Sequence, residues 1–343
     1  TLQENNGGAT GAVSLAGNVA AATLTTFAQG YDVSLTGAVN SITNDTTFLN
    51  TGAITIGDAA GDSSTFVGGL DTTAGGTENF AGTVQATNQQ IDIGAANITT
   101  DATIDGGSGA LNLGALTLAD GATLIVGTGA AGAPTITSVA GTAGGTASNL
   151  TLNTTGAASV GAVGTDIGTV TVTQSGGTTF SSTVGAATVT LTDTTGTIQF
   201  DGALTATDLN TVAAGYNVSL FGGSTITNAV TFSNTGTTQI GDATGDTNTF
   251  NGGVTATAGA VTASGSVVTS EDNLALGAVT LVEAQTLTLD TANTGGGDIT
   301  VASLTGVAGG SSENVTLESG SGTITVSGAI GTDIGTLTLQ ENN

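Results

Sequence analysis

Apolar and polar residues alternate along most of the chain, so that apolar side chains recur at every second position. The clearest runs are TVTVTQ (169–174), ATVTLTDT (187–194), LNLGALTLAD (111–120), TLTLDT (286–291) and GTITVS (322–327). A period of two is typical of β-strands, whose successive side chains point to opposite faces. Threonine fills many polar positions, and its branched side chain suits a pleated surface. No helical stretch is evident, so the sequence predicts an all-β protein.

The hexapeptide TLQENN occurs twice, at residues 1–6 and 338–343. If residue 343 were joined to residue 7, the sequence GTDIGTLTLQENNGGATGAV from Gly331 would align with GTDIGTVTVTQSGGTTFSSTV from Gly164. We therefore expect residues 1–337 to form one tile of a tandem array, with residues 338–343 overlapping the next tile.

A second repeat divides the tile into two diverged halves, with matched blocks at 30–163 and 215–330. Gly30 matches Gly215, but Leu113 matches Leu276, so the offset between matched positions shrinks along the blocks. A segment is therefore missing between blocks that remain recognisable. A solenoid tolerates the loss of a whole coil, because each coil contacts only its neighbours. A closed sandwich or barrel would rarely survive such a loss.

Phenylalanine residues recur at intervals close to the size of this deletion. Phe48 and Phe66 have the same spacing as Phe232 and Phe250, and Phe180 and Phe200 are only slightly further apart. One aromatic residue per coil predicts coils of about 18–21 residues, and about 18 coils in a tile. We predict a single continuous parallel β-helix (β-solenoid) over residues 1–343, with the right-handed winding that parallel strand connections generally adopt. Tandem immunoglobulin-like sandwiches are the main alternative.

The amino-acid composition excludes some classes of binding partner. The 343 residues include 26 Asp and Glu but no Lys, Arg, His, Cys, Met or Trp, which gives a net charge of −26. Nucleic-acid binding relies on Lys and Arg to neutralise phosphates, so we expect none. No apolar run approaches the ~20 residues of a membrane span, so we expect no membrane insertion. Because Met is absent, we interpret the chain as a processed product or a segment of a longer one.

Two similar turns offer the clearest candidate cation sites. GDAAGD (57–62) and GDATGD (241–246) place Asp58 and Asp62, and Asp242 and Asp246, four residues apart between glycines. Hard oxygen ligands suit Ca²⁺, so each pair is a candidate calcium site. The other interpretation is a polar turn retained by duplication, since Asp and Gly are ordinary turn residues. No other cofactor is indicated.

Enzymatic chemistry has few residues to use. Without His, Cys or Lys the chain cannot form Ser-His-Asp, Cys-His or Schiff-base machinery. A carboxylate pair is able to hydrolyse a glycoside, but the clearest Asp pairs are duplicated rather than unique. We therefore predict that the protein is not an enzyme and has no catalytic residues.

The Thr-, Gly- and Ala-rich strands, together with the absence of Cys, Lys and Arg, resemble the β-strand-repeat regions of giant bacterial surface proteins. These include filamentous-haemagglutinin-like adhesins and autotransporter passengers. The resemblance implies a structural, extracellular or cell-surface fibre and supplies no site residues. Its expected partners are copies of itself, end to end or as tandem tiles, and divalent cations. The alternatives are an adhesin shaft whose ligand-binding head lies outside this segment, and an ice- or calcium-binding solenoid.

Overall fold

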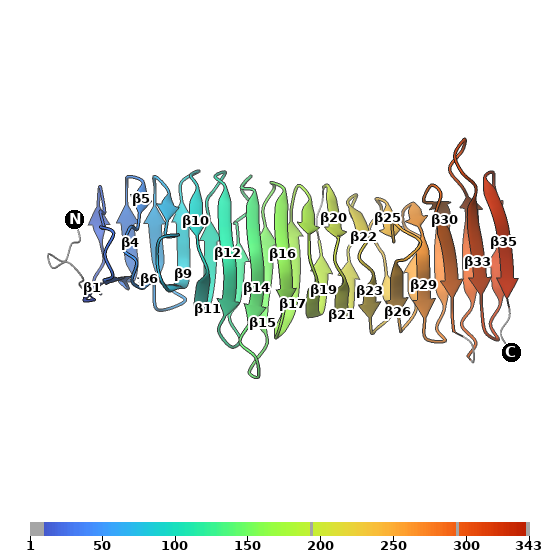
Figure 1. The fold of residues 1–343 in the computed structure, drawn as a ribbon, viewed down its shortest axis with the longest axis horizontal. Helices are drawn as coiled ribbons and strands as arrows, with labels where there is room; N and C mark the ends of the chain where they lie inside the picture. Colours follow the sequence, from blue (N-terminus) through green and yellow to red (C-terminus); the bar gives the residue numbers. More distant parts are fainter. Residues whose placement is uncertain (1–9, 193–194, 293–294, 341–343) are drawn as a thin grey trace. The chain divides into compact units, whose positions relative to one another are not determined.

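The computed structural model describes residues 10–192, 195–292 and 295–340, which form strands and turns and contain no helix (Figure 1). The strands are parallel and wind into a solenoid of about 15 turns, which confirms the predicted all-β, parallel β-helix fold. Contacts divide the chain into two compact units, Thr1–Gly176 and Gly177–Asn343. The matched block 30–163 lies in the first unit and 215–330 in the second.

The first unit contains strands β1 to β17. Their bounds are β1 (Ala12–Leu15), β2 (Ala20–Ala21), β3 (Asp32–Leu35), β4 (Val39–Ile42), β5 (Thr46–Thr47), β6 (Ile54–Ile56), β7 (Ser63–Phe66), β8 (Leu70–Asp71), β9 (Glu78–Ala86), β10 (Ile91–Ile93), β11 (Ala96–Asp105), β12 (Leu111–Leu118), β13 (Thr123–Val126), β14 (Pro134–Gly141), β15 (Ser148–Asn153), β16 (Ala158–Gly164) and β17 (Ile167–Gln174).

These strands form three parallel ladders, one for each wall of the coil. The first ladder runs β1–β3–β6–β9–β11–β12–β14–β16. The second runs β2–β4–β7–β9–β11–β13–β15–β17. The third runs β5–β8–β10–β12–β14–β16. Long strands such as β9 and β11 span a corner and take part in two ladders.

The second unit contains strands β18 to β35. Their bounds are β18 (Thr178–Phe180), β19 (Val184–Leu191), β20 (Thr197–Phe200), β21 (Leu204–Thr211), β22 (Asn217–Leu220), β23 (Ser224–Ile226), β24 (Val230–Thr231), β25 (Thr238–Ile240), β26 (Thr247–Phe250), β27 (Val254–Ala256), β28 (Val261–Ala263), β29 (Gly265–Thr269), β30 (Leu274–Leu281), β31 (Thr286–Asp290), β32 (Ile299–Thr305), β33 (Glu313–Glu318), β34 (Ile324–Val326) and β35 (Ile334–Gln340).

Three ladders recur in this unit. One runs β18–β20–β22–β25–β28–β30–β32. Another runs β19–β21–β23–β26–β29–β31–β33–β35. The third contains β24–β27–β30–β32–β34. Main-chain hydrogen bonds therefore run from coil to coil along every wall.

The core of each unit consists of columns of inward side chains that lie in register from coil to coil. In the first unit one fully buried column is Leu35, Ile56, Phe80, Ile98 and Leu118. In the second unit a comparable column contains Phe180 and Phe200, whose rings stack with their centroids 4.8 Å apart and their planes 7° from parallel. The alternation in the sequence thus becomes an apolar interior and a polar exterior.

Coil length varies more than the sequence suggests. The paired residues Glu78 and Ala96 lie much closer together in the sequence than the paired residues Thr286 and Asn314 do. The predicted coil length matches only the shorter coils, which is why about 15 turns form and not the larger number expected. Between Thr286 and Asn314 the additional residues leave the register of β31 and β33 unchanged. The handedness of the winding stays a prediction.

The phenylalanine spacing has two structural origins. Phe180 and Phe200 are direct partners on neighbouring coils, so the interval between them is one coil. The interval from Phe48 to Phe66 is not, because Phe66 pairs with Ile42 on the preceding coil. In the second unit Phe250 likewise pairs with Ile226, and its ring meets Phe232 edge-on at 6.1 Å. The phenylalanines of these pairs lie on successive coils but on different walls, so the interval between them is not the length of a coil.

The sequence duplication is accompanied by a shift in strand register that occurs once in each unit at the same place in the repeat. In the first unit Ser148 pairs with Ile167, but the next residue, Asn149, pairs with Thr169, so β17 contains one extra residue. In the second unit Glu313 pairs with Ile334, and the register of β33 and β35 then shifts in the same way. The matched sequences GTDIG at 164–168 and 331–335 carry both shifts. The repeated TLQENN lies largely outside the described residues, and only 338–340 fall within β35.

Candidate functional site

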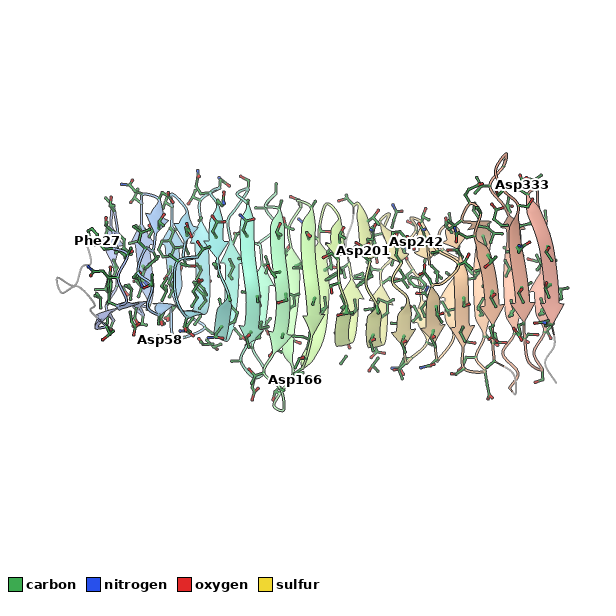
Figure 2. The ribbon with its side chains drawn as sticks, viewed as in Figure 1. Phe27, Asp58, Asp166, Asp201, Asp242 and Asp333 are labelled. Carbon is green, nitrogen blue, oxygen red and sulfur yellow. The ribbon has the colours of Figure 1, made fainter. Side chains whose placement is uncertain are left out.

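The predicted aspartate pairs lie in two equivalent turns, one in each unit. Asp58 and Asp62 lie between β6 and β7, and Asp242 and Asp246 lie between β25 and β26. Asp58 and Asp242 are exposed and are labelled in Figure 2. Each turn therefore brings its own two carboxylates together, as the sequence predicted.

One carboxylate of each pair binds the main chain of its own turn. Oδ2 of Asp62 accepts hydrogen bonds from the main-chain N–H groups of Asp58 (2.9 Å) and Ala59 (3.0 Å). Oδ2 of Asp246 accepts the same two bonds from Asp242 (2.9 Å) and Ala243 (2.8 Å). An aspartate that accepts two N–H groups stabilises a tight turn by itself.

One pKa in each pair is shifted, and the two shifts have opposite directions. The hydrogen bond from the Asp58 main chain is the main reason that the pKa of Asp62 lies below its usual value. In the other turn the pKa of Asp242 is raised, first by partial desolvation and then by the hydrogen bond and negative charge of Asp246. Each turn thus places an exposed carboxylate beside one that is bonded to the main chain. Ca²⁺ binding at both turns stays a prediction.

A third acidic group, not singled out from the sequence, lies on the third ladder of the first unit. Asp45, Asp71 and Asp92 line a hollow there, and Asp71 and Asp92 are paired in register. Their positions in the sequence do not show that these residues lie together, because this follows only from the register of the strands. Within residues 10–192, 195–292 and 295–340, no three His, Cys, Asp or Glu side chains lie close enough to hold a metal ion.

Two glutamates that the sequence analysis did not single out are buried. Glu78 is 2% exposed and Glu313 is 0% exposed. A usable signal was present, because Glu78 has the same strand parity as Phe80, and Glu313 the same parity as Leu317. An acidic residue at an inward position is unusual, because burying a charge is costly unless it is paired.

Comparisons with known proteins provide no relative. No protein-family model matches the chain, and neither the curated proteins nor the solved structures include a significant match. Within the described part of the chain, no helix is long and apolar enough to span a membrane. The proposal that follows therefore rests on the fold, the repeats and the charge.

Proposed function

We propose that this chain is a structural segment of a long, acidic fibre outside a bacterial cell, built by stacking coils on further coils of the same kind. The fibre spans distance as a stalk, sheath or filament and supports attachment or aggregation. It resembles the repeat regions of bacterial adhesins in style. No residue acts as a catalyst in this proposal, and the mechanical role belongs to the ladders and the core columns.

The duplicated register shift is the observation that carries the proposal. β15 with β17, and β33 with β35, share their sequence pattern and the extra residue at the start of the pairing, and β15 and β17 shift once more at Asn153. The chain has therefore reused one stacking interface. Such interfaces add up along a solenoid, because each coil contacts only its neighbours.

The second copy of this interface has an apolar row of the kind that β17 buries, which suits stacking on a further coil. The inward residues Val170 and Val172 of β17 are both 0% exposed. Their counterparts in β35 are Leu337, which is half-buried, and Leu339, which is 60% exposed. An unpaired strand edge with an apolar row readily pairs with another strand. In the proposed array a coil of the same kind covers β35.

Composition fits a surface outside the cell. A chain without Lys or Arg offers no cleavage site to trypsin-like proteases. Its 26 acidic side chains repel one another within a Debye length of ~8 Å and keep neighbouring fibres apart. Divalent cations, Ca²⁺ in particular, are the partners that we propose for bridging such fibres.

Fibre diffraction or cryo-electron microscopy of assembled material tests the proposal. We expect a strong reflection near about 4.8 Å along the fibre axis, because strands of successive coils are stacked at that spacing. Leu339→Asp is the matched disruptive variant and should reduce assembly, whereas Thr338→Ser on the same strand should not. Assembly that gives no axial reflection, or a chain that stays monomeric at every concentration, would contradict a stacked fibre.

The rows of outward side chains support ice binding less well than the other observations support a fibre. Thr205, Thr225 and Thr249 lie in register on three successive coils. The row then continues with Val268 and Asp290. A flat, regular threonine array is therefore interrupted, and no observation favours this function over the fibre.

A further inference from the structure

Each unit holds one glutamate inside the wall of its coil. Glu78 at the start of β9 pairs with Ile54 and Ala96, so its column is otherwise apolar. Glu313 at the start of β33 pairs with Ile334. The chain has no Lys, Arg or His, so no side-chain cation is present to balance a buried negative charge. An ionised carboxylate in such a place is costly.

Both glutamates follow turns of the same sequence type. AGGTEN at 74–79 ends with Glu78 and an asparagine, and AGGSSEN at 308–314 ends with Glu313 and an asparagine. A third copy, AGGTASN at 143–149, has Ser148 where the second copy has Glu313, and both pair with an isoleucine of the following coil. Glu78 lies on a different wall, the first ladder. Ser148 is 0% exposed, and its hydroxyl donates to the main-chain oxygen of Ala119 at 2.8 Å. One corner therefore uses a neutral donor, a role that a protonated carboxyl also fills.

The two glutamates differ in their hydrogen bonds. Oε2 of Glu78 accepts from the Thr72 hydroxyl (2.7 Å) and the Gly94 main-chain N–H (3.2 Å). Oε1 of Glu313 accepts from the Ala284 N–H at 3.2 Å, while its Oε2 has no partner among the described residues.

The charged groups around both corners are acidic. Asp71 adds its negative charge at the first corner, where Thr72 also contacts the main-chain oxygen of Asp92. At the second corner Glu283 accepts a bond from the turn, and the main-chain oxygen of Asp333 accepts the Glu313 N–H. The charge of Asp71 opposes ionisation of Glu78.

We propose that the corner at Glu78 is an acid-stabilised joint, at which a protonated Glu78 tightens the coil stack and an ionised Glu78 loosens it. This proposal does not depend on the fibre function. Desolvation is the main reason that the pKa of Glu78 rises to about 7, and it outweighs the bonds from Thr72 and Gly94. Between about pH 4.5 and pH 7 the folded chain therefore holds a proton that the unfolded chain has lost. Stability is thus highest on the acid side of this window and falls as the pH rises through it.

The direct test is an NMR titration of the full chain with ¹³C-labelled glutamate carboxyl groups. Glu78→Gln assigns its resonance among the seven glutamates. We expect Glu78 to titrate near neutrality, well above the value of about 4.3 of a glutamate in a model peptide. Thr72→Val removes a donor that favours the ionised form and should move the Glu78 midpoint upward. A Glu78 midpoint equal to that of the exposed glutamates overturns the proposal.

Thermal unfolding between about pH 5 and about pH 8 gives the second readout. The wild-type midpoint should fall by several degrees across this range, and Glu78→Gln should flatten the slope. Asp120→Asn removes an exposed carboxylate from the same unit and should leave the slope unchanged. An unaltered slope in a folded Glu78→Gln variant overturns the proposal. If Glu78→Gln does not fold, the shift of the Glu78 midpoint in Thr72→Val still tests the proposal.

Discussion

At the scale of single residues, glycine allows the main chains of neighbouring coils to touch at a corner. Gly57 follows β6 with φ of +76°, and a Cβ at this position would overlap the carbonyl oxygen of Ala81. Gly241 in the second unit has the same φ and the same relation to the carbonyl oxygen of Ser264. Both the left-handed conformation and the contact exclude a side chain.

We therefore expect Gly57→Ala to destabilise the chain by about 2 kcal/mol or more, because the substitution adds backbone strain to a steric overlap. Gly61→Ala is the matched control, since a Cβ there meets nothing within 4 Å in the same turn. Its effect should stay within about 0.5 kcal/mol. Urea denaturation measures both values, and equal losses for the two variants would show that the corner contact is unimportant.

At the scale of elements, the two units contain the same buried polar pair with its members exchanged. Asn40 of β4 pairs with Ser64 of β7 and donates to its hydroxyl at 3.0 Å. In the equivalent strands β23 and β26, Ser224 pairs with Asn248 and donates to its Oδ1 at 2.8 Å. Each pair precedes an Ile–Phe pair by two residues, so the positions are equivalent.

This exchange predicts coupling between the two positions. Ser224→Ala should cost about 1–3 kcal/mol, because it leaves the buried Oδ1 of Asn248 without its donor. The double exchange Ser224→Asn with Asn248→Ser should restore most of that stability, since it recreates the arrangement of the first unit. A double-mutant cycle by denaturant unfolding measures the coupling. Additive losses from the two single exchanges would show that the positions act independently.

The sequence predicted the class of these elements better than their register. Alternation identified the strands because each has one apolar face, and the duplicated aspartate turns formed where expected. The coil length was misjudged because Phe48 and Phe66 belong to different ladders, while turns of variable length separate strands of fixed pairing. The buried Glu78 was missed because an acidic residue is normally outward, and only its parity with Phe80 indicated otherwise.

At the scale of the whole molecule, negative charge is the dominant unbalanced force. The formal charge of −26 has no cationic side chain to oppose it. Repulsion between carboxylates favours an expanded chain, and dissolved ions weaken it over the ~8–10 Å of the Debye length. Stability of both units should therefore depend on the salt around them more than is usual.

We predict that the unfolding midpoint rises steadily as NaCl increases from about 10 to about 300 mM. At matched ionic strength Ca²⁺ should raise it more than Mg²⁺, if the aspartate turns bind calcium. Asp58→Asn together with Asp242→Asn should remove this excess, because the turn bonds of Asp62 and Asp246 remain. Scanning calorimetry gives the comparison, and identical effects of the two cations would leave screening alone as the explanation.

The unequal spacing of paired residues also bears on how such a chain evolves. Turns change length from coil to coil, yet strands such as β31 and β33 keep their register across a long turn, and elsewhere the change is absorbed by a local register shift. An in-frame duplication or deletion of one coil in the gene would then alter the length of the protein by one step of about 4.8 Å without compensating changes elsewhere. The length of such a protein is therefore set by the number of coils that its gene encodes.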